Sequence, residues 1–153
     1  MTIDDAVAFF EERDQAKIMR KLKPLQDVGL GYVQLGQSSS TLSGGEAQRI
    51  KLASFLVKSN TKDKVLFIFD EPTTGLHFHD INKLLKSFNA LIAKGHSVIV
   101  IEHNMDLVKC ADHVIDLGLT GGEYGGQLIA YGTPEVVAKN KESLTSQYLA
   151  ERL

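Results

Sequence analysis

The sequence predicts an α/β fold in which flanking helices cover a mostly parallel sheet. Two short apolar runs without polar alternation, Val65–Phe69 and Ser97–Ile101, are typical of strands buried on both faces. The stretch between them has helical spacing, so the three elements form one right-handed βαβ crossover by the usual handedness rule. Each run ends in polar residues, Asp70-Glu71 and Glu102-His103-Asn104. Because parallel strands end at one edge of a sheet, where ligands bind, we expect His103 to lie near Asp70 and Glu71.

Length and composition predict one compact domain of ordinary soluble character. The 153 residues suffice for one core, and 17 basic and 19 acidic side chains leave a net charge of −2, which favours no polyanionic partner. The one cysteine, Cys110, excludes an internal disulfide and a cysteine-rich zinc site. No apolar run is long enough to span a membrane, and Met1–Asp5 resembles a helix cap more than a signal peptide. We therefore expect a cytoplasmic protein with no membrane partner.

Two helices and a glycine-punctuated connector are predicted at the start of the chain. Apolar residues recur at helical spacing over Ile3–Phe10 and over Ile18–Leu25, where Pro24 should kink the helix or begin a new turn. The second helix has a basic face that could contact a DNA backbone, although such a face is more often simply solvated: Lys17, Arg20, Lys21 and Lys23. Glycines interrupt Val28–Gln37, and Ser38–Thr41 continues it as a polar loop.

The stretch Leu42–Arg49 has the composition of an anion site at a helix start. Ser43, Gly44 and Gly45 precede a helical run that continues to Val57. The unpaired N–H groups and the positive dipole end at a helix start favour an anion, and glycine lets the backbone approach it closely. The simpler alternative, a helix capped by a serine, needs neither the two glycines nor the whole octet.

Two carboxylates, Asp70 and Glu71, follow the first predicted strand. At such a strand end one carboxylate can hold Mg²⁺ beside a phosphate while its neighbour orients an attacking water. A hydrophobic strand followed by an acidic turn also occurs in α/β proteins that bind no nucleotide, so this stretch alone leaves both interpretations open. Beyond it, Pro72–His77 predicts a loop, and Ile81–Ile92 predicts a helix that stops at Lys94-Gly95.

The remaining elements are shorter. A helix is predicted over Met105–Cys110, followed by strands over His113–Leu117 and Gln127–Tyr131. The glycine-rich stretch Gly118–Gly126 between these strands predicts a hairpin turn and not a phosphate loop, because no lysine or helix start follows it. Two helices, Pro134–Lys139 and Ser143–Arg152, are predicted at the end.

Four stretches in this order resemble the second half of an ATP-binding-cassette (ABC) ATPase domain: Leu42–Arg49, Val65–Pro72, Thr73–His77 and Ile101–Asn104. In that family the matching stretches are the signature motif, the Walker B motif, the D-loop and the H-loop. The resemblance implies a P-loop-type α/β fold of which this chain would form the C-terminal half, with a partial sheet that lacks the Walker A strand. The chain would be a single unit, with a helical part over residues 1–60 and an α/β part over residues 61–153.

The same resemblance implies ATP and Mg²⁺ as ligands and gives each matching residue a role. Asp70 would help to hold Mg²⁺, Glu71 would polarise the hydrolytic water, and His103 would contact the γ-phosphate. The signature residues would close on the γ-phosphate of a nucleotide held by a different ATPase lobe: Ser43, Gly44, Gly45 and, beside them, Glu46.

More narrowly, Val28–Gln37, Phe69–Leu76 and Ile101–Leu117 resemble the C-terminal end of the UvrA family, the damage-recognition ATPases of bacterial nucleotide excision repair. This resemblance implies three partners for the full-length protein: DNA, UvrB and a second copy of itself.

Two features of that family are absent from the sequence. No glycine is followed by lysine, so the Walker A phosphate loop is missing, and the zinc modules need CxxC pairs that Cys110 cannot provide. We therefore expect a fragment of a larger protein that is inactive alone, with zinc confined to parts outside this sequence. His77-Phe78-His79-Asp80 offers two histidines without further ligands, so these are expected to be surface residues.

Two other functions stay open. The chain could be the end of a transporter's nucleotide-binding domain, or a regulatory module that keeps the signature but not the chemistry. Gly118–Gly126 and the long approach over Gly29–Gln37 favour repair over transport. Glu71 and His103 argue against a regulatory module, because a purely structural domain needs neither side chain.

Overall fold

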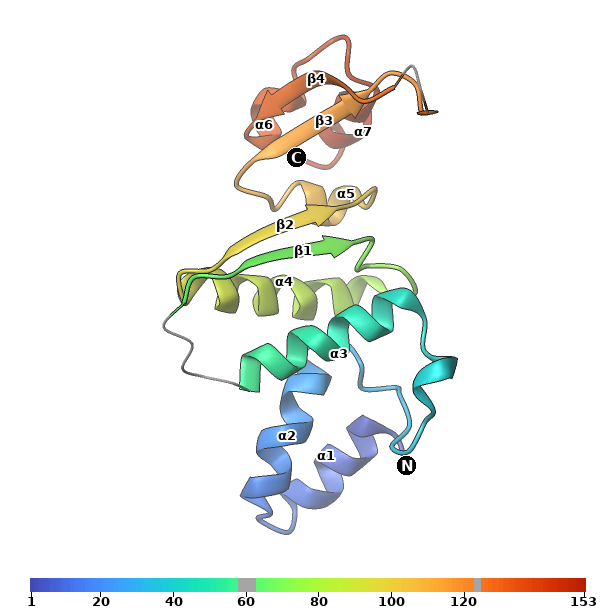
Figure 1. Ribbon diagram of the computed structural model, residues 1–153, viewed down its shortest axis with the longest axis vertical. Helices are drawn as coiled ribbons and strands as arrows, with labels where there is room; N and C mark the ends of the chain where they lie inside the picture. Colours follow the sequence, from blue (N-terminus) through green and yellow to red (C-terminus); the bar gives the residue numbers. More distant parts are fainter. Residues whose placement is uncertain (58–62, 123–124) are drawn as a thin grey trace. The chain divides into compact units, whose positions relative to one another are not determined.

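The computed structural model describes residues 1–57, 63–122 and 125–153, and their contacts divide them into two units, Met1–Ile101 and Glu102–Leu153 (Figure 1). The predicted boundary at residue 60 lies outside the described residues, and the single unit predicted from chain length stays a prediction. Within the described ranges, no helix is long and apolar enough to cross a membrane.

The first unit begins with the three helices that the sequence predicts, α1 (Ile3–Glu11), α2 (Ala16–Asp27) and α3 (Gly44–Val57). The predicted polar loop Ser38–Thr41 contains a short 3-10 helix, η1 (Ser39–Thr41). Thr2 caps α1, since its side chain accepts from the Asp5 N–H at 3.1 Å while the Asp5 carboxylate accepts from the Thr2 N–H at 3.1 Å. The helix α2 continues through Pro24 to Asp27.

The connector after α2 packs tightly against a later helix, α4 (Phe78–Ala93). Gly29 has a left-handed φ of 78°, and a Cβ built there would lie 3.2 Å from the Asp80 Cβ. A side chain at this position would therefore be strained and crowded at once. Further along the connector, Leu30 and Val33 are buried in the same unit.

The strands β1 (Leu66–Asp70) and β2 (Ser97–Ile101) pair in parallel, with Asp70 opposite Ile101. This pairing and the intervening α4 confirm the predicted order of strand, helix and strand. Phe67 and Phe69 are buried, and the Phe69 ring lies 4.9 Å from that of Phe88 on α4.

The prediction that these strands are buried on both faces is wrong for the described chain. Leu66 and Ile68 are 55% and 63% exposed, and the β1 residues alternate between exposed and buried. The alternation arises because successive strand residues point to opposite faces, and α4 packs on the face that carries Phe67 and Phe69.

The second unit contains α5 (Met105–Val108), the antiparallel strands β3 (Val114–Gly118) and β4 (Gln127–Gly132), and the helices α6 (Pro134–Val137) and α7 (Leu144–Ala150). Its core is built from Ala130, Val137 and Leu149. Asp116 on β3 accepts from the Ser143 and Thr145 hydroxyls at 2.6 and 2.9 Å, which fixes the start of α7 against the hairpin. The antiparallel pairing is as predicted, while residues 123–124 of the predicted turn lie outside the described residues.

Candidate functional site

The start of α3 combines a helix cap with an open backbone. The Ser43 hydroxyl accepts from the Glu46 N–H at 3.2 Å, and the Glu46 carboxylate accepts from the Ser43 N–H at 2.7 Å. This is a capping box, which satisfies two of the unpaired donors at the helix start. Gly44 is exposed, and a Cβ built there would meet no atom within 4 Å. The helix start therefore has both features considered from the sequence, a serine cap and an accessible glycine backbone.

Tyr32 in the connector binds the same carboxylate. Its hydroxyl donates to Glu46 Oε1 at 2.6 Å. This hydrogen bond, together with that from the Ser43 N–H, lowers the pKa of the Glu46 carboxyl. Partial burial raises the pKa of the Tyr32 hydroxyl, and donation to Glu46 raises it further. The start of α3 is thereby tied to the connector by a hydrogen bond to a charged acceptor.

Gln48 ties α3 to the end of β1. Its side-chain Nε2 donates to the Asp70 carbonyl at 3.0 Å, and its Oε1 accepts from the Asp70 N–H at 3.2 Å. The Asp70 residue itself is exposed at the end of the strand. One side chain of the predicted anion-site stretch thus fixes the backbone of the predicted Mg²⁺ ligand.

Arg49 ties α3 to the loop between β1 and α4. The residue is fully buried, and its Nη1 donates to the carbonyls of Pro72 at 2.6 Å and Thr74 at 3.4 Å. Its Nη2 donates to the Tyr32 hydroxyl at 3.4 Å. Gly45 packs against this cluster, because a Cβ built there would lie 3.4 Å from Arg49 Nη1 and 3.5 Å from the Thr74 carbonyl oxygen.

Glu71 has an unusual backbone conformation for a residue with a side chain. Its φ is 46°, in the left-handed region that favours glycine. Two hydrogen bonds fix this conformation: the Glu71 N–H donates to the Ile101 carbonyl at 2.9 Å, and the Glu71 carbonyl accepts from the Thr74 N–H at 3.1 Å. Residues in strained conformations persist where their surroundings impose them, and such residues gather at functional sites.

His103 belongs to the second unit, just before α5. Its backbone N–H donates to the Glu102 carboxylate at 2.9 Å, and the following Asn104 caps α5 by accepting from the Asp106 N–H at 3.0 Å. His103 is exposed. Its predicted nearness to Asp70 and Glu71 stays a prediction.

The donor set of the first unit is suited to a phosphate and a hard cation. Gly44 is an exposed glycine at the start of α3, a helix of fourteen residues. Backbone N–H groups at such a helix start can bind an anion. The exposed Asp70 carboxylate is the oxygen ligand that Mg²⁺ prefers, usually together with phosphate oxygens and water. Within the described ranges, no three His, Cys, Asp or Glu side chains are grouped to bind a metal by themselves.

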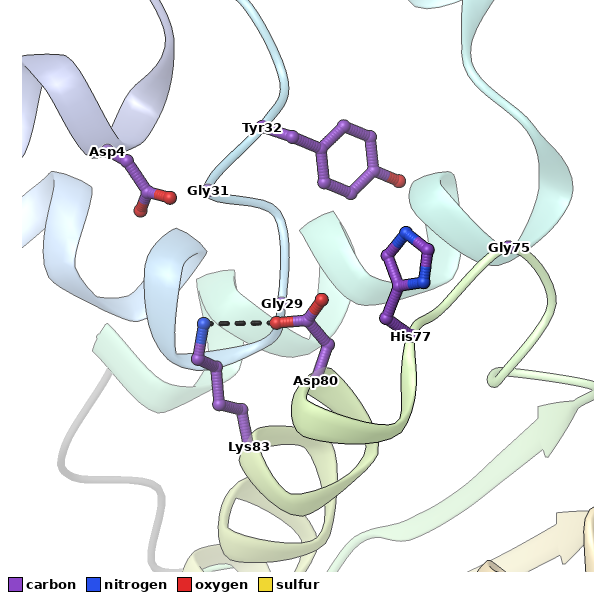
Figure 2. Close-up of a pocket in the computed structure, with 8 residues that line it drawn as sticks. All are labelled: Asp4, Gly29, Gly31, Tyr32, Gly75, His77, Asp80 and Lys83. Carbon is purple, nitrogen blue, oxygen red and sulfur yellow. Dashed lines mark hydrogen bonds and ion pairs between the residues drawn. The ribbon is translucent and has the colours of Figure 1, made fainter.

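A pocket of about 260 Å³ lies beside this region, and side chains from α1, the connector and α4 line it (Figure 2). Its charged groups already bind one another or a neighbour. Asp80 pairs with Lys83 at 3.0 Å, and Asp4 accepts from the Gln26 side chain at 2.7 Å. Because these carboxylates are satisfied within the chain, the pocket itself indicates no ligand.

Three residues of this region were given no role of their own from the sequence: Tyr32, and, within the predicted signature stretch, Gln48 and Arg49. The spacing Ser43-x-x-Glu46 is a readable signal for the capping box. Gln48 and Arg49 bind backbone groups more than twenty positions away, at Asp70, Pro72 and Thr74. Every residue has a backbone carbonyl, so the sequence does not indicate which of them a distant side chain binds.

Comparisons with known proteins agree on one family of relatives. The chain is 59% identical over 149 residues to UvrABC system protein A of Mycoplasmopsis pulmonis, which covers 97% of this chain and 16% of the relative. It is 56% identical over 153 residues to UvrABC system protein A of Clostridium perfringens, again 16% of that protein. The chain therefore spans about a sixth of the length of these relatives. No protein-family model matches it.

Solved structures give the same result. The fold matches UvrA2 from Deinococcus radiodurans with a TM-score of 0.85 and 45% identity, over 100% of this chain and 18% of that chain. It also matches a bacterial Atm1-family ABC exporter with ATP bound, with a TM-score of 0.58 and 24% identity, over 99% of this chain and 26% of that chain. The second match shows the fold alone. Together they show that the mixed α/β arrangement is that of ABC ATPase structures.

Proposed function

We propose that this chain, homologous over its whole length to one segment of UvrABC system protein A, supplies part of an ATP-hydrolysing site in nucleotide excision repair. In this proposal it is the C-terminal half of an ABC ATPase domain, without the Walker A strand. Leu42–Arg49 is its signature, Val65–Pro72 its Walker B motif, Thr73–His77 its D-loop and Ile101–Asn104 its H-loop.

One observation carries the proposal beyond homology. Side chains of α3 bind the backbone at the end of β1: Gln48 hydrogen-bonds to the Asp70 carbonyl and N–H, and Arg49 donates to the Pro72 carbonyl in the loop that follows. A helix start suited to an anion and an acidic strand end are thus held in a fixed relation to one another, although in this proposal they serve two different nucleotides.

The chain's own residues have separate tasks in this site. Asp70 would hold the cation, Glu71 would orient and polarise the water, and His103 would contact the γ-phosphate. Mg²⁺ bound with ATP supplies the positive charge that offsets charge on the phosphoryl group. Ser43, Gly44, Gly45 and Glu46 serve a nucleotide that another ATPase lobe holds, because this sequence has no phosphate loop of its own.

The proposed partners follow from the same homology: DNA, UvrB and a second copy of the longer protein. An identity of 56–59% with UvrABC system protein A across nearly the whole chain favours repair over membrane transport.

The test places two substitutions in the longer ATPase that contains this segment. Gly44→Asp puts a negative side chain where a phosphate must approach, so it should block closure of the partner site while leaving ATP binding intact at both sites. Glu71→Gln keeps the shape but removes the carboxylate, so ATP should bind yet hydrolyse about two to three orders of magnitude more slowly.

Single-turnover hydrolysis, measured with the other site's Walker A motif disabled, distinguishes the two results. Gly121→Asp is the matched control, since a Cβ at Gly121 also meets no atom within 4 Å. The assignment of the signature to a partner lobe is wrong if both substitutions silence the same site.

A further inference from the structure

Arg49 joins three segments of the first unit at one buried point. It is the largest of the fully buried side chains, and it lies on α3. Its guanidinium donates to the Pro72 and Thr74 carbonyls in the loop after β1 and to the Tyr32 hydroxyl in the connector. All three hydrogen-bond partners are neutral oxygen atoms, and the Arg49 charge also contributes to the lowered pKa of the Glu46 carboxyl.

Stability alone does not account for this arrangement. Burying a guanidinium costs free energy, and replacing buried charged groups by apolar ones of similar volume is often neutral or stabilising. Among the described residues, the Arg49 Nε has no hydrogen-bond partner. The donors that are used, Nη1 and Nη2, all point to the loop and the connector, so the side chain serves the geometry of those segments.

The geometry that Arg49 sets includes the signature backbone. A Cβ at Gly45 would lie 3.4 Å from Arg49 Nη1, 3.5 Å from the Thr74 carbonyl oxygen and 3.7 Å from the Glu71 carbonyl oxygen. Gly45 therefore rests on a surface formed by the guanidinium and by the loop that it binds. The loop therefore lies close to the Gly45 backbone, with room for little more than one Cβ between them.

We propose that Arg49 is a positioning residue that fixes the loop 71–75 against α3 and thereby couples the Glu71 side of the site to the signature glycines. The proposal rests on the proposed function. Arginine suits this task because its planar fork presents several donors in fixed directions, whereas lysine presents a point charge on a flexible stem. Arg49→Lys retains the charge but not the simultaneous contact with two carbonyls and a phenol.

The first test measures loop order in the 153-residue chain by NMR relaxation. In Arg49→Lys the backbone order parameters of Thr73, Thr74 and Gly75 should fall from about 0.85 towards about 0.6, the values of rigid and flexible backbone. Lys51→Arg is the matched control, because Lys51 is exposed two positions further along the same helix. The control should leave these order parameters unchanged.

Melting curves of Arg49→Lys and Lys51→Arg show whether each variant is folded under the conditions of the NMR measurement. A folded Arg49→Lys chain with an ordered loop overturns the proposal. If Arg49→Lys unfolds the chain, Tyr32→Phe decides, since Tyr32 is 49% exposed and the change removes only the hydroxyl. Lower order at Thr74 and Gly75 in Tyr32→Phe supports the proposal, and an unchanged loop overturns it.

The second test measures catalysis in the longer ATPase. Arg49→Lys should lower kcat about a hundredfold, the size expected when a distant change misplaces reacting groups, with the Kd for Mg²⁺-ATP unchanged. A loss of ATP affinity as large as the loss in kcat contradicts a positioning role. If the unsubstituted ATPase does not hydrolyse ATP, the proposed function fails, while the loop measurement still judges Arg49 independently.

Discussion

Gln48 and Asp70 exchange two hydrogen bonds, from the Gln48 amide to the Asp70 carbonyl at 3.0 Å and from the Asp70 N–H to the Gln48 amide oxygen at 3.2 Å. The side chain thereby satisfies the backbone of the last β1 residue as a neighbouring strand would. Because Gln48 lies one position before Arg49, the same turn of α3 binds both the end of the strand and the loop that follows it.

Removing this side chain should weaken the first unit. Gln48→Ala leaves two backbone groups of Asp70 without partners, so the free energy of unfolding should fall by about 1–2 kcal/mol in urea denaturation. Asn82→Ala is the control, because Asn82 is exposed on α4. Equal effects of the two substitutions would show that the Gln48 hydrogen bonds do not form in solution.

The Glu46 cap should make stability depend on acid pH. Hydrogen bonds from Tyr32 and Ser43 lower the pKa of Glu46 in the folded chain, so the stabilisation is complete above the unfolded value of about 4.3 and is lost as pH falls through the folded pKa.

Urea unfolding at several acid pH values measures this effect. Glu46→Gln should lose less stability on acidification than the unsubstituted chain, and Tyr32→Phe should lie between the two because it removes the larger cause of the shift. An unchanged pH profile in Glu46→Gln would contradict the assignment.

A substitution at Glu71, which has a left-handed backbone, should not lower the free energy of unfolding, unlike the substitutions above. Glu71→Gly relieves the strain at a φ of 46°, so unfolding free energy should stay level or rise by up to about 1 kcal/mol. Glu12→Gly is the matched control, since Glu12 has an ordinary φ of −59° and glycine there only adds entropy to the unfolded chain. Thermal melting of both variants checks the difference, and an equal loss in both would refute it.

The exposed face of the β1–β2 sheet should promote self-association. Four apolar side chains on these strands are 49–63% exposed: Leu66, Ile68, Ile99 and Ile101. An apolar face on a sheet with two described strands favours association, so we expect the chain to associate at high concentration in analytical ultracentrifugation.

The matching variant is Ile68→Lys, which should shift the chain towards monomer. Ile92→Lys, at a 42% exposed position on α4, should not. A monodisperse and highly heat-stable monomer of the unsubstituted chain would count against the prediction.

The chain alone should bind Mg²⁺-ATP weakly and hydrolyse none. Most affinity for the phosphates would come from a Walker A loop, and no glycine in this sequence is followed by lysine. Isothermal titration calorimetry with Mg²⁺-ATP measures the binding. Tight binding would require a phosphate cradle within these 153 residues.

Most of the secondary structure could be predicted from local patterns. Helical spacing marks α4, and two apolar runs that end in polar residues mark β1 and β2 as a parallel pair. Exposure of one sheet face could not be predicted in this way, because an apolar run has the same composition whether one face or two are covered. An apolar run shows that a strand has side chains suited to burial on both faces, but it does not show which other elements cover those faces in this chain.

The residues that connect the site were harder to predict. A charged side chain in a helix is usually exposed, so nothing local indicates that Arg49 is buried. Its partners are carbonyls that every residue possesses, at Pro72 and Thr74. Asp70, Glu71 and the glycine pair could be proposed from the sequence because their chemistry depends on residue type, whereas the contacts around them depend on backbone position.

The Glu46 carboxylate has a consequence for how the signature surface meets a nucleotide. It accepts hydrogen bonds from Ser43 and Tyr32 and is attracted by the Arg49 charge, so it acts as a built-in counter-ion at the positive end of α3. Its negative charge thus offsets part of the positive potential at this helix start. Under the proposed function, the Glu46 charge weakens the attraction between the signature and a phosphate. Directed hydrogen bonds from the backbone N–H groups at Gly44 and Gly45, more than net positive charge, would then hold the phosphate of the partner lobe.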